Sequence, residues 1–474
     1  MAKSLESRFE AYCDEMVKAL AHIDRRTPAR WYLQGLMLPG SRKSVEPMAA
    51  RVHPEDVRSA HQSMHHLVAQ SDWSDAALLA AVAAEVLPTL TRAHSSTSVL
   101  IVDDTGFAKK GVHSVGVAHQ YCGQLGKTAN CRVAVSVSVA NDAGSLPIGF
   151  RLYLPREWTD DRSRCEHVGV PERIGFQTKN EIARTLIADA LKAGIAFGTI
   201  LADAAYGDET DLRDWLTTQG LAYAMGVRPA TTLWWGDHQP VPDPTPGTRG
   251  KARHTLVRDP DHQPISAAAL AQALPRNNFR KVTWREGSAA PLSSRFARVR
   301  VRAAHRDYPR AEEWLIIEWP ANEELPTRYW LSTLPAATSM CKLVDTIKAR
   351  WRIERDYQEL KQEFGLGHFE GRNWRGFHHH ISLCIAAYGF LMRERLIAGK
   401  KNAARFRSPP IPEGFRPRGS VADATSSAGL DCDSALPIGQ TASHKPSTAA
   451  PAAVGLLNVP FAFNNTVVLA ACRT

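Results

Sequence analysis

The chain contains no Cys-x-x-Cys pair, no internal repeat, and no apolar run reaching the roughly 18 residues of a membrane-spanning helix. Its 8 cysteines are scattered over 474 residues, so neither a disulfide framework nor a zinc ribbon is indicated. The N-terminal segment also lacks the apolar core of a signal peptide. These absences favour a soluble cytoplasmic protein without a membrane partner.

Acidic residues are fewer than basic ones, 48 against 58, which gives a net charge of +10 and an isoelectric point near 9.2. The hydrophobic fraction of 44% and the charged fraction of 22% are ordinary for globular proteins. A chain of 474 residues is too long for one compact core, so we expect about two to four domains. The basic balance is compatible with a polyanionic partner such as DNA, and also with solubility alone.

Residues 1–95 show a helical period of apolar side chains. The first run consists of Leu5, Phe9, Tyr12, Met16, Leu20 and Ile23. A second run opens at Ser74 and Asp75. The sequence therefore predicts a helical N-terminal domain, which either docks on DNA or only packs against the rest of the chain.

The pattern changes at Val99 to a buried strand that runs into Asp103 and Asp104. Neighbouring strand residues point to opposite faces, so the two carboxylates cannot easily enter one site together. Two further strand candidates, 131–140 and 146–154, predict a meander.

A helix predicted over 179–193 leads into a second short apolar strand, 199–202, which ends at Asp203. Open α/β sheets place their functional groups outside the carboxyl ends of strands. An aspartate in that position can also simply cap the helix that follows. The two strand ends together therefore make a stronger site candidate than either aspartate alone.

A helix predicted from about 339 to 364 begins after Ser339 and ends before Gly365. Positions i, i+4, i+7 and i+11 form one stripe on its surface, occupied by Arg350, Glu354, Tyr357 and Lys361. The stripe displays a carboxylate between two cations. It is either part of a site or a solvated face with i,i+4 ion pairs.

The segment 231–335 is rich in proline connections and strand-like runs. Alternation along one strand puts Arg298, Arg300 and Arg302 on the same face as Phe296. We call these three arginines the arginine strip. Such a basic, aromatic-edged strip either contacts DNA or faces solvent.

The run His378-His379-His380 lacks a further ligand at a fixed spacing, which favours core or surface histidines over a metal site. Beyond residue 401 the composition shifts to proline, serine, alanine and glycine, and this predicts a disordered tail over 401–474.

Taken together, Arg350-(x3)-Glu354-(x6)-Lys361, preceded by strand ends at Asp104-Thr105 and Asp203, resembles the DDE transposases of bacterial insertion sequences. The resemblance runs from about residue 30 to 400 and includes Lys109-Lys110-Gly111, His113 to Val117, and Tyr121 to Lys127. That family carries a Tyr-x2-Arg-x3-Glu-x6-Lys signature. Here Ile347 replaces its tyrosine, which puts one DNA contact in doubt but not the metal site.

The resemblance implies an α/β fold: an RNase H-like catalytic domain, interrupted by a β-rich insertion and preceded by an N-terminal helical domain. The expected division is a helical domain over 1–95, the first catalytic part over 96–230, the insertion over 231–335, the second catalytic part over 336–400, and the tail.

It also implies that Asp104, Asp203 and Glu354 hold two Mg²⁺ ions, with Mn²⁺ as a substitute, and that Arg350 and Lys361 contact phosphates. Asp104 is preferred to Asp103 because it directly precedes the threonine. The implied partners are double-stranded DNA, as element ends and target, and a second copy of the chain in a nucleoid-associated complex. Two alternatives are a decayed copy that only binds DNA and a repair or defence nuclease on the same fold.

Overall fold

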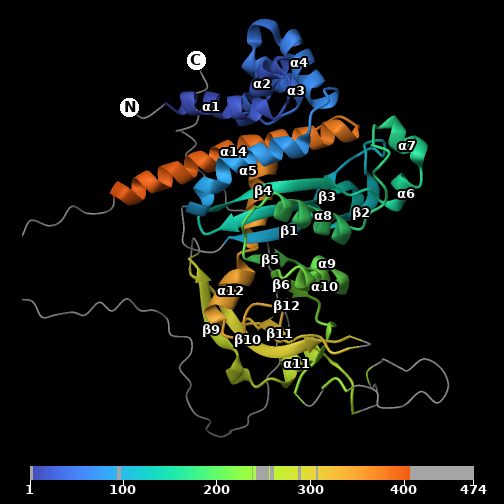
Figure 1. The fold of residues 1–474 in the computed structure, drawn as a ribbon, viewed down its shortest axis with the longest axis vertical. Helices are drawn as coiled ribbons and strands as arrows, with labels where there is room; N and C mark the ends of the chain where they lie inside the picture. Colours follow the sequence, from blue (N-terminus) through green and yellow to red (C-terminus); the bar gives the residue numbers. More distant parts are fainter. Residues whose placement is uncertain are drawn as a thin grey trace, which may run out of the picture. The chain divides into compact units, whose positions relative to one another are not determined.

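The computed structural model describes residues 4–92, 98–236, 239–241, 256, 261–286, 290–305 and 308–405 (Figure 1). Contacts divide the chain into two units, Met1–Pro410 and Ile411–Thr474, and everything described below lies in the first. Apart from its first five residues, the predicted tail lies outside the described part of the chain. No helix in that part is long and apolar enough to cross a membrane.

Helices fill the described part of 4–92, as predicted. They are α1 (Leu5–Lys18), the 3-10 helix η1 (Ile23–Arg25), α2 (Arg26–Met37), α3 (Val45–Val52), η2 (Pro54–Asp56), α4 (Val57–Ala69) and α5 (Asp75–Arg92). Side-chain caps fix two of their starts, because Ser4 accepts from the Ser7 amide and Asp56 from the Ser59 amide. That these helices form a separate domain stays a prediction.

The described strands form one sheet in the order β2-β3-β1-β5-β6-β12-β11-β10-β7-β8, with β4 paired to β3 and β9 to β10. Its first part contains β1 (Val99–Ala108), β2 (Ala118–Cys122), β3 (Lys127–Asn141), β4 (Gly144–Leu152), β5 (Thr199–Ala202) and β6 (Ala222–Val227). The strands β1, β3 and β4 are antiparallel neighbours, so the predicted meander is confirmed, with β2 as an additional short strand.

Three strands in the interior of this sheet, β1, β5 and β6, are parallel neighbours. Val99 pairs with Thr199 and Ile101 with Leu201. The chain returns from β4 to β5 through α6 (Arg156–Thr159), α7 (Arg162–His167) and α8 (Lys179–Lys192), and from β5 to β6 through α9 (Ala204–Gly207) and α10 (Thr210–Thr218). This parallel arrangement brings the carboxyl end of β5 beside the middle of β1, where Asp103 lies.

The strands of the 231–335 segment extend this sheet instead of forming a sheet of their own. They are β7 (Thr232–Trp234), β8 (Ile265–Ser266), β9 (Arg280–Arg285), β10 (Leu292–Ala303), β11 (Glu313–Glu318) and β12 (Arg328–Ser332), joined by α11 (Ala267–Ala273) and η3 (Arg276–Asn278). The junction is the antiparallel pair β12–β6, in which Leu331 lies opposite Met225. The segment is β-rich, as predicted, and it is hydrogen-bonded directly to the parallel strands.

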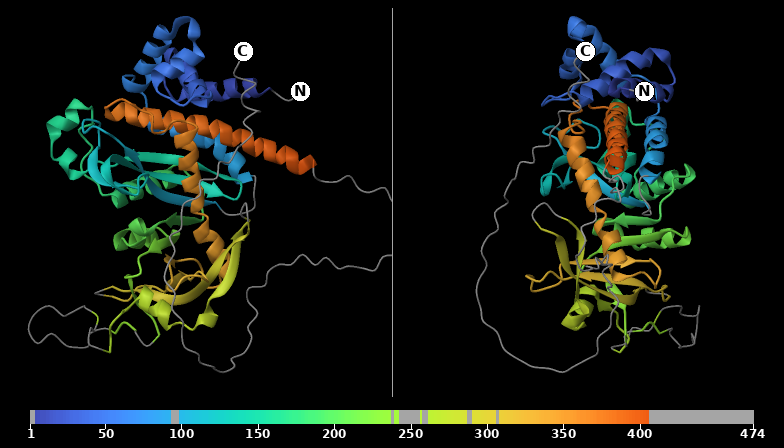
Figure 2. Two further views of the ribbon diagram at one scale, coloured as in Figure 1. Left: turned by 180° about the vertical axis from the view of Figure 1, so that it is seen from behind. Right: turned by 90° about the vertical axis from the view of Figure 1, so that its left-hand side faces the viewer.

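Two layers of helices cover the β1–β4 part of the sheet. On one face, α5 and α14 (Trp374–Arg405) run side by side in both views of Figure 2 and contact β4. The same face receives α13 (Trp351–Gln362), which contacts β1, β4 and α14. The opposite face is covered by α8, whose Leu186 packs against the backbone of Gly149.

The helix predicted from 339 to 364 is two helices, α12 (Met340–Lys348) and α13, and this part of the prediction was wrong. At the break, hydrogen bonds run from residue i to i−3: the Arg352 amide donates to Ala349 and the Ile353 amide to Arg350. The start after Ser339 is confirmed, since its side chain accepts from the Lys342 amide. The break places Arg350 at the N-cap of α13 and Glu354 in its first turn.

The three histidines at the start of α14 are core residues, the first of the two placements, core or surface, that the sequence left open. His379 stacks on Trp73 with ring centroids 3.6 Å apart, and His380 bonds the Tyr32 hydroxyl at 2.8 Å. Burial lowers the pKa of both imidazoles to about 4. They link α14 to the N-terminal helices.

Candidate active site

The middle of β1 presents two carboxylates on opposite faces of the sheet. Asp103 lies opposite Ser136 of β3 and faces α13, whereas Asp104 faces α8. The Asp104 amide donates to Asp103 Oδ1 at 2.9 Å, which ties the two residues together. The strand continues through both residues to Ala108, so β1 does not end at the aspartates as the sequence pattern had indicated.

Asp203 follows β5 directly and is the N-cap of the short helix α9. Its Oδ1 accepts from the Ala205 amide at 3.0 Å, so the capping role considered from the sequence is real. Its Oδ2 lies 3.6 Å from the Arg350 guanidinium. One carboxylate therefore serves both as a cap and as part of the charged cluster.

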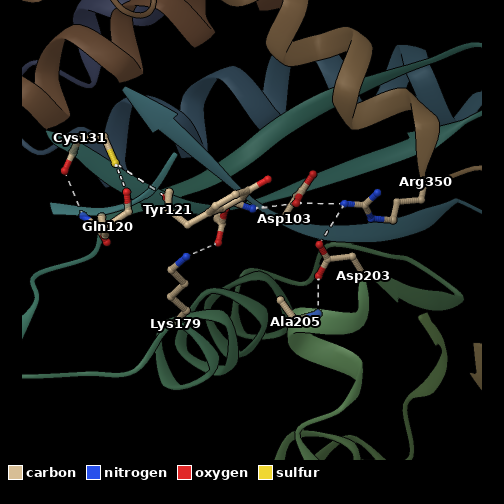
Figure 3. Close-up of polar contacts among 9 residues, drawn as sticks. Asp103, Gln120, Tyr121, Cys131, Lys179, Asp203, Ala205 and Arg350 are labelled. Carbon is tan, nitrogen blue, oxygen red and sulfur yellow. Dashed lines mark hydrogen bonds and ion pairs between the residues drawn. The ribbon is translucent and has the colours of Figure 1, made fainter. Parts of the chain in front are cut away.

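Arg350 joins the carboxylates of three separate elements. Figure 3 draws its contacts with Asp103 and Asp203. Its guanidinium lies 3.1 Å from Asp103, 3.6 Å from Asp203 and 3.2 Å from Glu354. The break between α12 and α13 turns this side chain toward the middle of β1 and the end of β5. The sequence analysis named Arg350 as a phosphate contact beside Asp104, Asp203 and Glu354, but it did not predict that the guanidinium pairs with Asp103 and Asp203. The catalytic role of these residues stays a prediction.

Exposure differs strongly among these acids. The side chain of Asp103 is 12% exposed, against 42% for Asp203 and 66% for Glu354. Burial raises the pKa of Asp103 to about 7, an effect that nearby Arg350 partly offsets and that Asp203 and Asp104 increase. Asp103 is thus an inner carboxylate held by Arg350, while Asp203 and Glu354 face the solvent side.

Asp104 lies outside the set of acids that Arg350 contacts and has a cation of its own. Lys179 Nζ, at the start of α8, lies 2.7 Å from Asp104 Oδ2 (Figure 3). Their side chains are 35% and 28% exposed, so this pair is more accessible than Asp103. Sequence reasoning did not select Lys179, although the Thr178-x-x-Glu181 capping box beside it was a usable signal.

The remaining stripe residues of α13 turn inward. Lys361 Nζ donates to the Gly106 carbonyl of β1 at 2.9 Å, and burial lowers its pKa. The Tyr357 hydroxyl bonds Ser136 of β3. These bonds hold the helix against the sheet, and the expected phosphate contact of Lys361 stays a prediction.

A hollow of about 460 Å³ opens on the solvent side of Asp203 and Glu354. Exposed cations on its wall include Arg228, after β6, and Arg328, at the start of β12. Trp351, beside Arg350, lines it as well. Sequence reasoning missed both arginines, because they reach the hollow only through the pairing of β12 with β6.

The arginine strip on β10 has partners within the chain. Arg298 donates to the Thr338 carbonyl, Arg300 to the Glu312 carbonyl, and Arg302 to the Arg310 carbonyl. Arg298 and Arg300 also lie over the Trp314 ring, at 4.9 and 4.8 Å from its centroid. The proposed DNA contact of these residues stays untested, and their contacts favour a role in holding β10 in place.

The donor chemistry of the site fits a hard divalent cation, because carboxylate oxygens are the ligands that Mg²⁺ prefers. Among the described residues, no group of three or more His, Cys, Asp or Glu side chains is arranged to hold a metal ion as it stands. Arg350 and Lys179 already neutralise these acids. Holding a metal would require Asp104, Asp203 and Glu354 to exchange these cations for the ion.

Comparison with known proteins gives two results. The model of a family described as DDE superfamily endonuclease matches residues 15–291, a stretch that contains Asp104 and Asp203 but not Glu354. The chain is also 30% identical over 199 residues to the "Probable transposase for insertion sequence element IS701" of Microchaete diplosiphon. That alignment covers 42% of this chain and 48% of the relative, so it spans about half of each.

Proposed function

The chain belongs to the DDE superfamily of endonucleases, whose model matches more than half of it, and from this membership we propose that it is an insertion-sequence transposase. It binds the ends of its element, cleaves the DNA and joins the cleaved strand to target DNA. The similarity to a probable insertion-sequence transposase supports this proposal.

The observation that carries the proposal is the meeting of the middle of β1, the end of β5 and Glu354 beside a cation-lined hollow. An RNase H-like core, with the strands of 231–335 inserted before the glutamate helix, accounts for the parallel order β1, β5, β6 and for the helices on both faces. The N-terminal helices would then be a separate DNA-docking domain, and the complex with DNA a homodimer.

We assign Asp104, Asp203 and Glu354 to hold the divalent ions. Because Asp104 lies on the other face of β1 from the Arg350 cluster, its side chain would have to turn toward Asp203 for the three carboxylates to share the ions. When bound, two Mg²⁺ ions, or Mn²⁺ in their place, activate the attacking oxygen and neutralise the leaving oxygen. A site shared with a phosphodiester must be accessible, and these three side chains are 28%, 42% and 66% exposed.

Asp103 has a different role in this assignment. It is the inner carboxylate that orients Arg350, so that the guanidinium can contact a phosphate near the cut. The opposite assignment, with Asp103 as the ligand, is supported by the approach of Arg350 to both Asp103 and Asp203. The two assignments predict different phenotypes for the Asp103 and Asp104 variants.

A second candidate function is a DNA-binding protein that has lost catalysis. Two observations support it: the carboxylates of Asp103 and Asp104 are already paired with Arg350 and Lys179, and the family match ends at residue 291, before Glu354. A repair or defence nuclease on the same fold is a third, which would cleave DNA without rejoining it.

The test is to incubate the purified full-length chain with a duplex carrying its flanking element end, with Mg²⁺ or with EDTA. We expect Mg²⁺-dependent cleavage at the element boundary and joining of the cut strand to a second duplex. Binding without cleavage would support a DNA-binding protein that has lost catalysis. Cleavage without strand joining would support a repair or defence nuclease. Absence of binding would contradict all three.

A further inference from the structure

A second charged pair, separate from the Arg350 cluster, lies on the other face of β1. Lys179 Nζ is 2.7 Å from Asp104 Oδ2, and the residues are 75 positions apart in the chain. The Arg350 cluster involves α13, whereas this pair involves α8. The function proposed above uses Asp104 but assigns no role to its partner.

The position of Lys179 is fixed by the start of α8. Thr178 Oγ1 accepts from the Glu181 amide at 3.2 Å, and Glu181 Oε2 accepts from the Thr178 amide at 2.7 Å. This capping box makes Lys179 the first residue of the helix. Downstream, α8 is anchored on the sheet by buried apolar residues such as Ile182 and Leu186. The backbone that carries Lys179 is therefore rigid.

The ammonium group still has bonding capacity. A lysine has three N–H donors, and the structure gives Lys179 one acceptor, Asp104. Its side chain is 35% exposed, so a ligand can reach it from solvent. The positive end of the α8 dipole adds to the potential at the same place. This combination is suited to a singly or doubly charged oxyanion.

We propose that Lys179 is a catalytic residue that contacts the reacting phosphate of the DNA, next to the Asp104 carboxylate. This inference rests on the proposed function, since it takes DNA as the substrate and Asp104 as part of the site. When Asp104 exchanges Lys179 for the ion, the released ammonium group donates to a non-bridging phosphate oxygen beside that carboxylate. A positioned donor of this kind stabilises the negative charge that grows on the phosphate oxygens during attack.

An ordinary surface ion pair is the competing explanation. Such a pair contributes only about 0 to 1 kcal/mol to stability and has no effect on DNA. The two explanations differ in two measurable quantities, the salt dependence of DNA binding and the rate of cleavage.

Three variants separate them. Lys179→Met removes the charge and keeps much of the side-chain length, Lys179→Arg keeps the charge, and Lys192→Met removes a lysine from the far end of the same helix. Binding to an element-end duplex is measured in EDTA from low to high salt, so that no cleavage occurs. Single-turnover cleavage of the same duplex is then measured in Mg²⁺, and thermal unfolding is followed for every variant.

For Lys179→Met we expect the slope of log K against log salt to become shallower by about 0.9, the value for one phosphate contact. Its cleavage rate should fall by about 10² to 10³. Lys179→Arg should restore the slope and part of the rate, and Lys192→Met should match the wild type in both.

An unchanged slope with an unchanged rate would overturn the inference, and so would a reduced rate with an unchanged slope, because Lys179 would then act only through Asp104. Loss of thermal stability with normal cleavage per folded molecule would identify a structural ion pair. If the wild-type chain neither binds nor cleaves the duplex, the proposed function itself fails, and this result is distinct from the others.

Discussion

Arg350 and Glu354 lie one turn apart at the start of α13, with Arg350 Nη1 3.2 Å from Glu354 Oε1. The same guanidinium reaches the middle of β1 and the end of β5. Glu354 therefore belongs to the cluster through Arg350, although its side chain is 66% exposed. The i,i+4 ion pair, which was one of two alternatives at the level of sequence, is present. That Glu354 also belongs to a catalytic site stays a prediction.

Replacing Glu354 by glutamine should lower DNA cleavage by several orders of magnitude. The change keeps size and helix propensity but removes the charge proposed to hold a divalent ion. Thermal stability should change by no more than about 1 kcal/mol, since the side chain is exposed. Strand cleavage on an element-end duplex, with circular dichroism melting, measures both effects.

The control is Glu359→Gln on the same helix. The structure places Glu359 against Arg395, at 2.5 Å, so this variant should lose a little stability and keep its cleavage per folded molecule. If Glu359→Gln abolished DNA cleavage while Glu354→Gln remained active, a different face of α13 would form the site.

Two variants of Asp203 should distinguish its role as a helix cap from its proposed role in catalysis. Asp203→Asn keeps an oxygen that can accept from the Ala205 amide but loses the charge, so it should fold normally and fail to cleave. Asp203→Ala loses both, and should also melt earlier, by about 0.5 to 2 kcal/mol. Cleavage assays and thermal melts of the two variants test this. Full activity of the asparagine variant would reduce Asp203 to a helix cap.

The two aspartates of β1 should behave differently. Asp104→Asn should abolish cleavage, whereas Asp103→Asn should weaken it by roughly 10- to 100-fold, as expected when a residue that orients another is lost. Rates for both variants at equal Mg²⁺ decide the assignment. If Asp103→Asn is inactive and Asp104→Asn is active, the ligand is Asp103, and the argument from exposure is wrong.

DNA binding should depend more on the hollow than on the arginine strip. Neutralising Arg228 and Arg328 together should make the slope of log K against log salt shallower by up to about 1.8, because each phosphate contact contributes about 0.9. Neutralising the strip should leave the slope nearly unchanged, because its guanidinium groups are bound to carbonyls of the chain. A flattened slope in the strip variant would instead support the DNA contact expected from the sequence.

Local patterns were sufficient for most of the elements. The apolar runs before Asp103 and Asp203 became the parallel strands β1 and β5, and the capping signal at Ser339 marked a true helix start. The break before α13 had no such signal, because the residues at the break are Ala349 and Arg350 and not the glycine or proline that commonly ends a helix. Sequence periodicity therefore predicted one helix where the chain makes a tight turn.

Long-range pairing accounts for the rest. Lys179 meets Asp104, and Arg328 reaches the hollow, only because of how helices and strands pack across the sheet. The joining of β12 to β6 likewise depends on edge pairing that no local pattern encodes. The acids could be selected because a family resemblance pointed to them, whereas their cationic partners required coordinates.

The last prediction concerns Asp356, which lies two residues after Glu354 on the buried face of α13. Its Oδ1 accepts from Ser145 at 2.5 Å and from Tyr388 at 2.9 Å, while Oδ2 is buried without a partner among the residues that the structure describes. Burial raises the pKa of this carboxyl from 3.8 to about 6, and the two hydrogen bonds only partly offset the effect.

A raised carboxyl pKa means that the folded chain binds the proton more tightly than the unfolded chain. The contribution of Asp356 to stability is therefore complete below about pH 4 and is lost as pH rises through about 6, by up to about 3 kcal/mol. Asp356→Asn cannot ionise, so its free energy of unfolding should fall less between pH 4 and 7 than that of the wild type. Urea unfolding across this range measures the difference, with Asp211→Asn as an exposed control. Parallel pH profiles for wild type and Asp356→Asn would show that Asp356 is ionised at no such cost, and that water or a nearby cation satisfies its second oxygen.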